Sequence, residues 1–437
     1  MEGRLHRFVI GCLSGLCASA LLASTTHAGP LVGAHPASAA PLGGINVPAI
    51  ESPSEAAREI TDARALHAKV VRIDLPWSSL EPVAPNQIDP AALASLDHLI
   101  NDASAAGIRV IATVDRSPCW ASSAPATLLS RCTPARTNDA SAWPPRVPAD
   151  YGDFVAYLAR RYGTHLAAIE VWNEPDHSNQ QYFAGPEKAP RYAAILRAAY
   201  AAIKRADPSI AVLGGSLVGA NGVFLRALYA AGIKGYYDGL AVHFYNLTLA
   251  SMRSFREVQI ANGDTKPLWL DEFGWSSCYP RHLVQEEQAC VTAAVQARNI
   301  TDIYHALSRT GYVAAQILFD LRDGADQFGV LSAQGLRKPA FTALTKVLAS
   351  PVGPQQPVTL RLSRRGGQVV ASGSGPVGDY MELEAFRGSR LRFRALFTLD
   401  RFDRYSLKLP RVLGTRGLRV RVYQYWAGEA RSAQRSI

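Results

Sequence analysis

Two acidic residues stand at the ends of apolar runs, a setting typical of catalytic carboxylates. Glu174 follows the run Leu166–Val171, and Glu272 closes a run that begins at Pro267. Short apolar runs of this kind are typical of strands buried on both faces. Pro175 cannot donate a backbone hydrogen bond, which predicts that the first strand stops there. Each run therefore predicts a carboxylate at the carboxyl end of a buried strand, where catalytic groups of α/β barrels sit.

A pair of carboxyl groups has a definite chemistry when both reach one substrate. One protonates the leaving oxygen of an acetal, and the other attacks the sugar carbon or activates a water. The two must differ in pKa, so their surroundings must differ. We therefore expect Glu174 and Glu272 to be a catalytic pair that cuts glycosidic bonds. Asn173 is expected to hydrogen-bond the sugar beside the scissile bond.

The segment from residue 43 to residue 350 alternates strand-like and helical patterns. Strands are expected at 44–50, 69–75, 108–114, 166–171, 210–214, 240–244, 267–272 and 313–319, and helices at 53–67, 89–106, 151–162, 192–203, 223–231, 286–307 and 338–348. This alternation predicts a (β/α)8 TIM barrel. A doubly wound sheet is the alternative, but no glycine-rich phosphate loop follows the first strand.

A different pattern begins after residue 354. Short strands are expected at 358–362, 368–372, 381–386, 390–397 and 418–425, which predicts a small antiparallel, β-sandwich-like domain over 355–437. From Pro351 onward there are 16 Lys and Arg against 6 Asp and Glu, so this segment carries 16 − 6 = +10, the net charge of the whole chain. An anionic glycan is one partner that fits such a surface, and a solvated arginine-rich face is the other interpretation.

The amino terminus has the pattern of an export signal. Arg4 and Arg7 precede the apolar stretch Phe8–Leu22, and a cleavage site fits at Ala28. We expect a signal peptide over 1–28, a linker over 29–42, and a periplasmic or secreted protein. A membrane anchor and a lipid attached at Cys12 are less favoured, because the apolar stretch is short. No later segment has the pattern of a membrane span, and no nucleic-acid partner is expected.

Four cysteines remain once a signal peptide is removed. An even number in an exported chain favours disulfides, and three pairings are possible. The local pairing, Cys119 with Cys132 and Cys278 with Cys290, would close two separate loops. Close Cys-x-x-Cys pairs that would indicate a metal site are absent from the sequence. Neither a metal nor an organic cofactor is required by the two-carboxylate chemistry.

The motifs Trp172-Asn173-Glu174-Pro175 and Asp271-Glu272-Phe273-Gly274 resemble the acid/base and nucleophile motifs of clan A glycoside hydrolases. The resemblance is nearest to glycoside hydrolase family 39 and its exopolysaccharide-processing relatives, and it covers roughly residues 44–348. It implies a retaining double displacement with Glu174 as acid/base and Glu272 as nucleophile. It also implies that Arg72, His243 and Tyr245 orient the nucleophile and bind the sugar.

Aromatic residues are expected near the same end of the barrel. Trp77, Trp120 and Trp275 fall on loops that follow strands, and aromatic faces stack on sugar rings. Each of these rings could instead fill the core. Clan members often place a tryptophan at the end of strand eight as a platform for the sugar. Phe319 stands there in this sequence.

The sequence thus predicts an exported retaining β-glycoside hydrolase acting on an oligo- or polysaccharide, with an exopolysaccharide as one such substrate. One alternative is a glycan-binding protein that keeps the barrel without catalysis, although the presence of both carboxylates disfavours it. The other is a matrix adhesion protein whose active part is the basic β domain.

Overall fold

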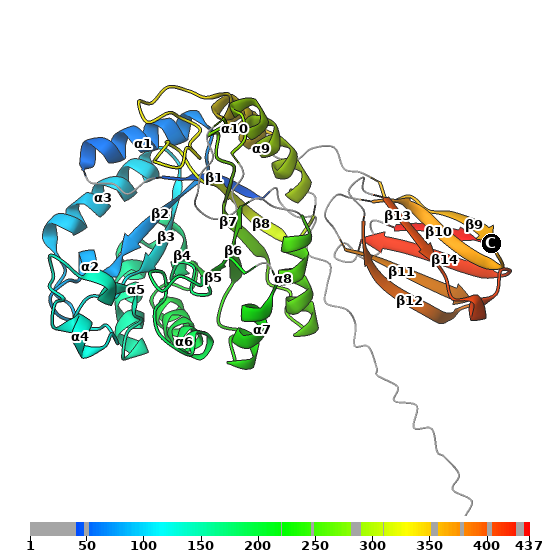
Figure 1. Cartoon of the computed structure of the whole chain (residues 1–437), viewed down its shortest axis with the longest axis horizontal. Helices are drawn as coiled ribbons and strands as arrows, with labels where there is room; N and C mark the ends of the chain where they lie inside the picture. Colours follow the sequence, from blue (N-terminus) through cyan, green and yellow to red (C-terminus); the bar gives the residue numbers. More distant parts are fainter. Residues whose placement is uncertain are drawn as a thin grey trace, which may run out of the picture. The chain divides into compact units, whose positions relative to one another are not determined.

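Eight parallel strands close into a barrel in the order in which they occur in the chain (Figure 1). They are β1 (Leu42–Asn46), β2 (Val70–Pro76), β3 (Arg109–Asp115), β4 (Leu166–Val171), β5 (Ala211–Leu217), β6 (Gly239–Tyr245), β7 (Leu268–Gly274) and β8 (Val313–Leu318). The predicted barrel is confirmed. The structure is a computed structural model that describes residues 41–47, 52–219, 221–245, 249–280, 290–308, 310–350, 357–375, 380–399, 404–424 and 432–437. The expected signal peptide lies outside the described residues.

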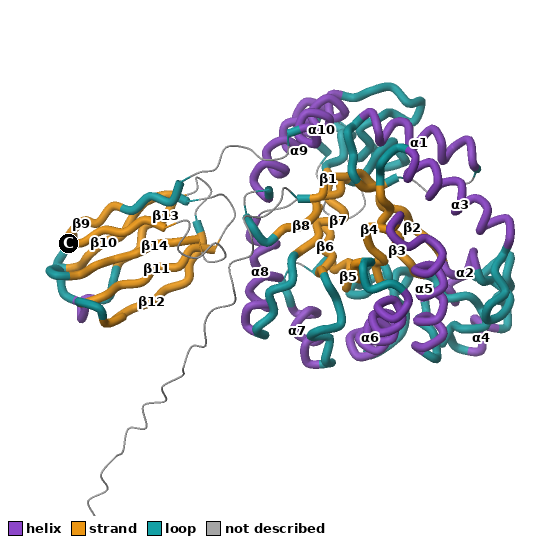
Figure 2. Tube along the Cα trace, turned by 180° about the vertical axis from the view of Figure 1, so that it is seen from behind, coloured by secondary structure: helices purple, strands orange, loops and turns teal. Residues whose placement is uncertain are grey.

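Helices surround the strands on the outside of the barrel (Figure 2). They are α1 (Pro53–Ala65), α2 (Trp77–Leu80), α3 (Pro90–Ala105), α4 (Ala126–Leu129), α5 (Pro148–Tyr162), α6 (Lys188–Ala206), α7 (Val223–Ala230), α8 (Leu249–Ala261), α9 (Ala293–Leu307) and α10 (Pro339–Ala349). Among the helices that the structure describes, none is both long and apolar enough to cross a membrane.

Local capping sets where several helices begin. Ser52 accepts a hydrogen bond from the backbone nitrogen of Glu55, and Pro53 occupies the first turn of α1. The helix expected over 286–307 begins later among the described residues, because Thr292 caps the first turn of α9. Helix α8 was not expected from the sequence.

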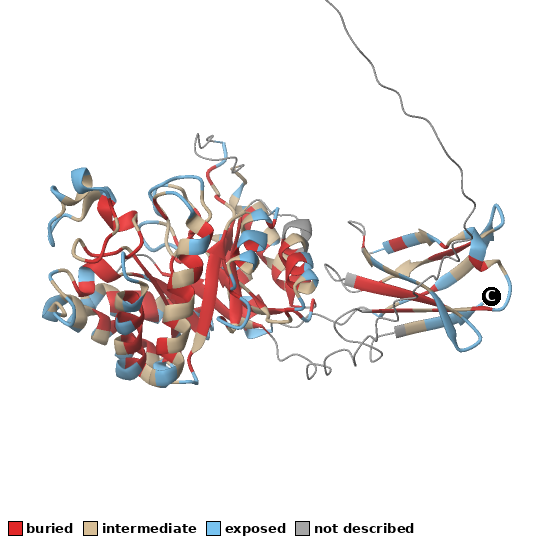
Figure 3. Cartoon of the chain, turned by 90° about the horizontal axis from the view of Figure 1, so that it is seen from below, coloured by how far each residue is buried: buried red, intermediate tan, exposed pale blue. Residues whose placement is uncertain are grey.

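The interior of the barrel is layered. Strand residues two apart point to the same side, so the positions of β2 alternate between the barrel interior and the helices. Val70 belongs to an apolar cluster inside the barrel, together with Ile111 and Leu213. Arg72, two residues after Val70, lies in a polar layer next to this cluster, with Glu170. Most residues of the barrel strands are buried (Figure 3). The apolar cluster fills the barrel interior next to this polar layer.

The C-terminal domain consists of two antiparallel sheets that share one apolar core. Its strands are β9 (Arg361–Arg365), β10 (Gln368–Ser374), β11 (Tyr380–Arg387), β12 (Arg390–Thr398), β13 (Arg404–Lys408), β14 (Leu418–Gln424) and β15 (Ser432–Ser436). The sheet orders are β13-β10-β9 and β12-β11-β14-β15. Buried Val420, Val422 and Leu383 contribute to the core between them. The predicted β domain is confirmed, although β13 and β15 were not expected.

Candidate active site

Strand β4 ends at Val171, four residues before the proline that was expected to stop it. Trp172 adopts a left-handed backbone conformation with φ 73°, and Glu174 does so with φ 49°. A non-glycine residue in this region is uncommon, and the two together turn the chain sharply. The Trp172 ring is consequently buried in the core outside the barrel, against Phe183. Glu174 is directed toward β6, two strands along the barrel, where it meets His243.

Strand β7 carries one extra residue where its acidic pair lies. Val242 pairs with Leu270, but the next residue of β6, His243, pairs with Glu272, so Asp271 is bulged. A bulge interrupts the alternation of side chains along a strand. Asp271 and Glu272 can therefore both reach the barrel interior, although they are adjacent in sequence. Both lie within 3.6 Å of the Arg72 guanidinium.

Arg72 connects the groups at this end of the barrel. Its Nη1 donates to Glu272 Oε1 at 2.8 Å and to Asn46 Oδ1 at 3.0 Å. Its Nη2 donates to Asn173 Oδ1 at 3.0 Å, and its Nε donates to Glu170 Oε2 at 3.0 Å. The side chain is buried. Although burial disfavours the charge, Glu170 and Glu272 raise the pKa of Arg72 further above its ordinary value. One permanent cation thus fixes groups from β1, β4 and β7.

The two expected catalytic carboxylates meet across the barrel. A ligand oxygen of Glu174, one of Glu272 and a ring nitrogen of His243 all lie within 4.8 Å of one another. His243 Nδ1 is 2.7 Å from Glu174 Oε1 and 3.3 Å from Glu272 Oε2. Tyr245 donates its hydroxyl to Glu272 Oε2 at 2.7 Å. The structure therefore brings together all four of these sequence-predicted residues.

The surroundings separate the pKa values of the two carboxyls. Burial opposes ionisation of Glu174, but the hydrogen bond with His243 holds its pKa below the ordinary value. Burial raises the pKa of Glu272, against the opposing effects of His243 and Arg72. Burial also opposes the charge of His243, but Glu272 and Glu174 raise its pKa. In the free protein, the proton shared by these two residues is therefore carried by His243, which donates it in a hydrogen bond to the ionised Glu174.

A second pair of carboxyl groups lies beneath the first. Glu170 accepts from Arg72 and, at 3.1 Å, from the hydroxyl of Thr113. Against the effect of burial, Arg72 holds the pKa of Glu170 at about 2. Neither side-chain oxygen of Asp271 has a hydrogen-bond donor among the described residues. Burial and the nearby Glu170 raise the pKa of Asp271 well above its ordinary value. Asp271 is therefore the protonated member of this pair.

Two groups of side chains have the spacing of metal ligands. Glu170, His243 and Asp271 place ligand atoms within 4.8 Å of one another, as do Glu174, His243 and Glu272. The guanidinium of Arg72 lies 3.0 Å from the first group and 2.8 Å from the second. A cation in either place would be repelled by this fixed charge at short range.

Replacing Asp271 by asparagine tests its protonation. The folded protein holds a proton on Asp271 that the unfolded chain releases above pH about 3.9, so this group lowers wild-type stability as pH rises. We expect the unfolding free energy of Asp271→Asn, relative to wild type, to increase with pH by up to about 1.4 kcal/mol per unit above pH about 4. Denaturant unfolding at a series of pH values measures this difference.

The matched control is Glu170→Gln, which removes the ionised member of the same pair. Glu170 has a depressed pKa, so its contribution is present above the unfolded-state value and is lost as pH falls toward about 2. Breaking the buried ion pair between Glu170 and Arg72 is expected to lower the unfolding free energy by about 3–5 kcal/mol near neutral pH. An unfolding free energy for Asp271→Asn that falls relative to wild type as pH rises would contradict a protonated Asp271.

Aromatic rings line one side of the carboxylate pair. Tyr245 lies edge-on to Phe319, with ring centroids 5.8 Å apart, and to Phe328 at 5.3 Å. Phe319 and Tyr245 are half-buried, so parts of both rings remain accessible. Trp275 follows β7 and is half-buried against the core. Its ring is edge-on to Phe273 at 6.4 Å.

The other two tryptophans lie outside the carboxylate cluster. Trp77 is fully buried and stacks on Phe154, and its indole nitrogen donates to Glu81. In this structure Trp77 is a core residue with no face for a sugar. Trp120 is half-buried, packs edge-on against Trp77, and donates to the Glu81 carbonyl at 2.9 Å. It lines a separate cavity of about 200 Å³.

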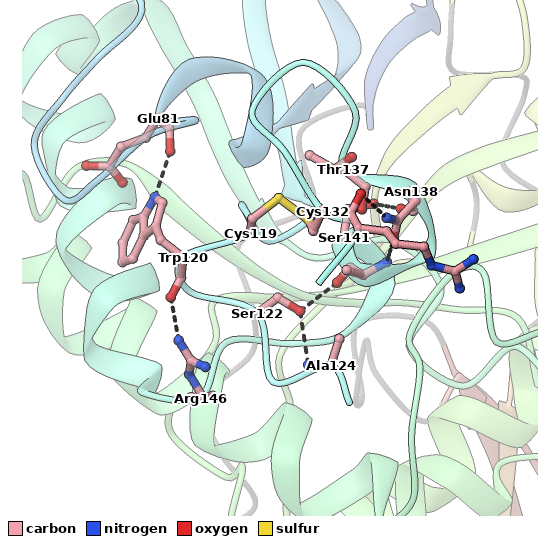
Figure 4. The surroundings of a disulfide bond; sticks show 12 residues. Glu81, Cys119, Trp120, Ser122, Ala124, Cys132, Thr137, Asn138, Ser141 and Arg146 are labelled. Carbon is pink, nitrogen blue, oxygen red and sulfur yellow. Dashed lines mark hydrogen bonds between the residues drawn. A yellow bond between two sulfur atoms is a disulfide. The ribbon is translucent and has the colours of Figure 1, made fainter. Parts of the chain in front are cut away.

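Trp120 is held by a cross-linked loop (Figure 4). Cys119 forms a disulfide with Cys132, and Cys278 forms one with Cys290. The local pairing is therefore the one that occurs. Arg146 donates to the Trp120 carbonyl at 2.6 Å, so both the disulfide and this hydrogen bond fix the loop after β3.

Some residues of the site were not singled out from the sequence. Asn46 ends β1 and accepts from Arg72, while its Nδ2 donates to the Asp271 carbonyl at 2.8 Å. Ser216 donates to Asn173 Oδ1 at 3.2 Å. Asn46 could have been found as a polar residue within an apolar run. Ser216 lies where β5 shifts register after a glycine pair, a feature without a sequence signal of its own.

Comparison with known families agrees with this geometry. Residues 37–312, more than half of the chain, match the family described as cellulase, glycosyl hydrolase family 5. The chain belongs to this family. The resemblance to clan A is confirmed, and a family 5 member is expected to hydrolyse glycosidic bonds. The search of curated proteins found no match.

Solved structures with a similar fold include members of families 5 and 39. A family 39 glycoside hydrolase from Bacteroides cellulosilyticus WH2 has a TM-score of 0.52 at 18% identity, covering 85% of this chain and 80% of its own. A monomeric beta-xylosidase from Caulobacter crescentus CB15 has 0.51 at 17%, covering 85% and 95%. A GH5_18 protein from Streptomyces cattleya, in complex with Manb1-4GlcNAc, has 0.53 at 17%, covering 72% and 83%.

Proposed function

We propose that this family 5 protein is a retaining β-glycoside hydrolase that acts on an oligo- or polysaccharide. The observation that carries the proposal is the approach of Glu174 and Glu272 to within 4.8 Å. Retaining enzymes hold their carboxyls about 5–5.5 Å apart, whereas inverting enzymes leave about 6.5–9.5 Å for a water. The observed spacing supports the retaining rather than the inverting arrangement.

Glu272 is proposed as the nucleophile because its two oxygens receive separate donors. Arg72 donates to Oε1 and Tyr245 to Oε2, and both contacts favour the ionised form. In the first step a Glu272 oxygen bonds to the anomeric carbon while the bond to the leaving oxygen breaks. Glu174 gives its proton to that oxygen. In the second step Glu174 takes a proton from water, whose oxygen displaces Glu272 from the sugar.

His243 is proposed to supply the proton that Glu174 transfers. Glu174 is the lower in pKa of the two carboxyls, which is the reverse of the order expected for a resting general acid. The 2.7 Å contact between His243 Nδ1 and Glu174 Oε1 resolves this, because the proton needs to move only along one hydrogen bond. Substrate that excludes water from the pair would favour the neutral carboxyl.

The sugar is proposed to lie against Asn173 and the aromatic side of the site. Arg72 and Ser216 both donate to Asn173 Oδ1, which orients the amide nitrogen as the group that can meet a sugar hydroxyl. Phe319 and Tyr245 offer half-buried rings beside Glu272, where a sugar face can stack. Trp120 and Trp275 are proposed to contact more distant sugar units.

We further propose that the protein is exported and that its substrate is a polymer such as an exopolysaccharide. Two disulfides fit an oxidising compartment. The basic C-terminal domain is proposed to contact an anionic glycan.

Product stereochemistry tests the proposed reaction. The full chain is incubated with a panel of β-linked oligo- and polysaccharides, and the anomeric proton signals are followed by NMR from the first turnover. We expect the β-anomer of the new reducing end to appear first and then to mutarotate. First appearance of the α-anomer would overturn the retaining mechanism, and product from Glu272→Gln at the wild-type rate would overturn the site.

A further inference from the structure

A groove of about 870 Å³ opens in the C-terminal domain. It lies where β9 and β15, the edge strands of the two sheets, approach each other. Its floor is apolar, formed by buried Leu360 and Tyr405 and half-buried Leu362. Ligand sites commonly have volumes of about 300–1,000 Å³, so the groove can hold a short glycan segment.

The rim of the groove is polar and positively charged. Arg361, Arg404 and Arg435 line it, whereas its described lining contains no acidic side chain. The hydroxyls of Thr359 and Ser374 also lie on the rim, 2.8 Å apart. The side chains of Arg361 and Arg435 are exposed. Guanidinium groups and hydroxyls together match a ligand that carries both carboxylates and hydroxyls.

The acidic residues that the structure describes in this domain lie away from the groove. Glu382 and Glu384, the two that the structure describes in this domain, lie on β11 inside the four-stranded sheet and do not line the groove. Glu384 accepts from Arg394 at 2.7 Å and from Arg421 at 2.6 Å. Arg394 and Arg421 are therefore neutralised within the protein, whereas no described acidic residue pairs with Arg361 or Arg435.

We propose that this groove binds a segment of a carboxylated glycan, with Arg361 and Arg435 pairing with the carboxylates of uronic-acid units. This inference rests on the proposal above that the domain contacts an anionic glycan, and it specifies the place and the chemical group. Neutral glycans lack the carboxylate that the arginines would pair with. The groove would hold the polymer without taking part in the bond cleavage at Glu174 and Glu272.

The test measures binding of the full chain to polygalacturonate by affinity electrophoresis, with dextran as the neutral comparison. We expect wild type to bind polygalacturonate and not dextran, and the affinity to fall as salt is raised. The double variant Arg361→Gln/Arg435→Gln is expected to bind at least about 10-fold more weakly, because it removes both guanidinium groups that would pair with the carboxylates.

The matched control is Arg390→Gln/Arg411→Gln. It removes the same charge from exposed arginines of the same domain that do not line the groove. We expect this control to bind within about twofold of wild type, since exposed charges away from the ligand are screened. Equal weakening of both double variants would overturn the groove in favour of diffuse charge, and absence of wild-type binding would overturn the proposal altogether.

Hydrolysis of a small soluble glycoside separates this inference from the proposed function. Both double variants should hydrolyse it at the wild-type rate, because neither changes the barrel. A chain that binds polygalacturonate but hydrolyses nothing would leave the groove standing and the proposed function refuted. If the wild-type chain hydrolyses small glycosides but Arg361→Gln/Arg435→Gln binds polygalacturonate as tightly as wild type, the proposed function stands and the groove is refuted.

Discussion

Glu272→Gln is expected to lower kcat by at least about 10⁴-fold, because removal of a covalent nucleophile eliminates the step on which the other groups act. Glutamine has the same shape, so Arg72 keeps an oxygen to which it can donate. The amide, however, cannot bond to the anomeric carbon as a carboxylate does. Steady-state rates on an activated aryl glycoside, measured with enough protein to detect a single turnover, report the loss.

Folding of the Glu272→Gln variant must be verified independently of its activity. Its thermal unfolding should remain close to that of wild type, since the introduced glutamine would still occupy the buried site and contact Tyr245. A rate above about a hundredth of the wild-type rate would contradict a nucleophilic role. The corresponding loss, less than about 100-fold, would be no larger than that caused by removing a general acid or base.

Glu174→Gln is expected to give a loss that depends on the leaving group. A glycoside whose leaving oxygen needs a proton should be cleaved about 10²–10⁴-fold more slowly, the usual contribution of a general acid. An aryl glycoside with a strongly acidic phenol needs no such help, so its glycosyl-enzyme should form at close to the wild-type rate. A burst of phenol followed by slow turnover is the expected signature, because the second step still lacks its base.

A series of aryl glycosides with phenols of graded acidity provides the measurement. The rate of the first step in Glu174→Gln should fall steeply as the phenol becomes less acidic, whereas wild type should show a shallow dependence. Parallel dependences for the two proteins would show that Glu174 does not protonate the leaving group. His243→Gln is the companion variant, and it should show a weaker form of the same steep dependence.

The sequence was sufficient to place the two carboxylates. Each follows an apolar run, and parallel strands in a closed barrel bring their carboxyl ends to one rim. Arg72 was singled out through the resemblance to clan A glycoside hydrolases, and the structure places it against residues of both acidic motifs. The strand order and the basic β domain followed from changes in hydrophobic period.

Other features depended on tertiary structure and could not be read from the sequence. The left-handed conformation of Trp172 moved the end of β4 ahead of Pro175. The bulge at Asp271 placed two consecutive acidic residues inside the barrel, where alternation would have placed one. Trp77 had the pattern of a loop residue but fills the core, because packing against Phe154 decides its position. Such choices are set by neighbours distant in sequence.

The shared guanidinium of Arg72 has a consequence for how specificity can change. It holds Glu272 of β7, the proposed nucleophile, and, through the Asn173 amide, the turn that carries Glu174, the proposed acid/base. The distance between the reacting groups is therefore set by one rigid side chain with five fixed donors, which lysine could not replace. Apart from the turn at Asn173, the described loops that follow the strands do not hydrogen-bond to Arg72. Substitutions there can alter which sugars are accepted while the machinery for bond cleavage stays in register.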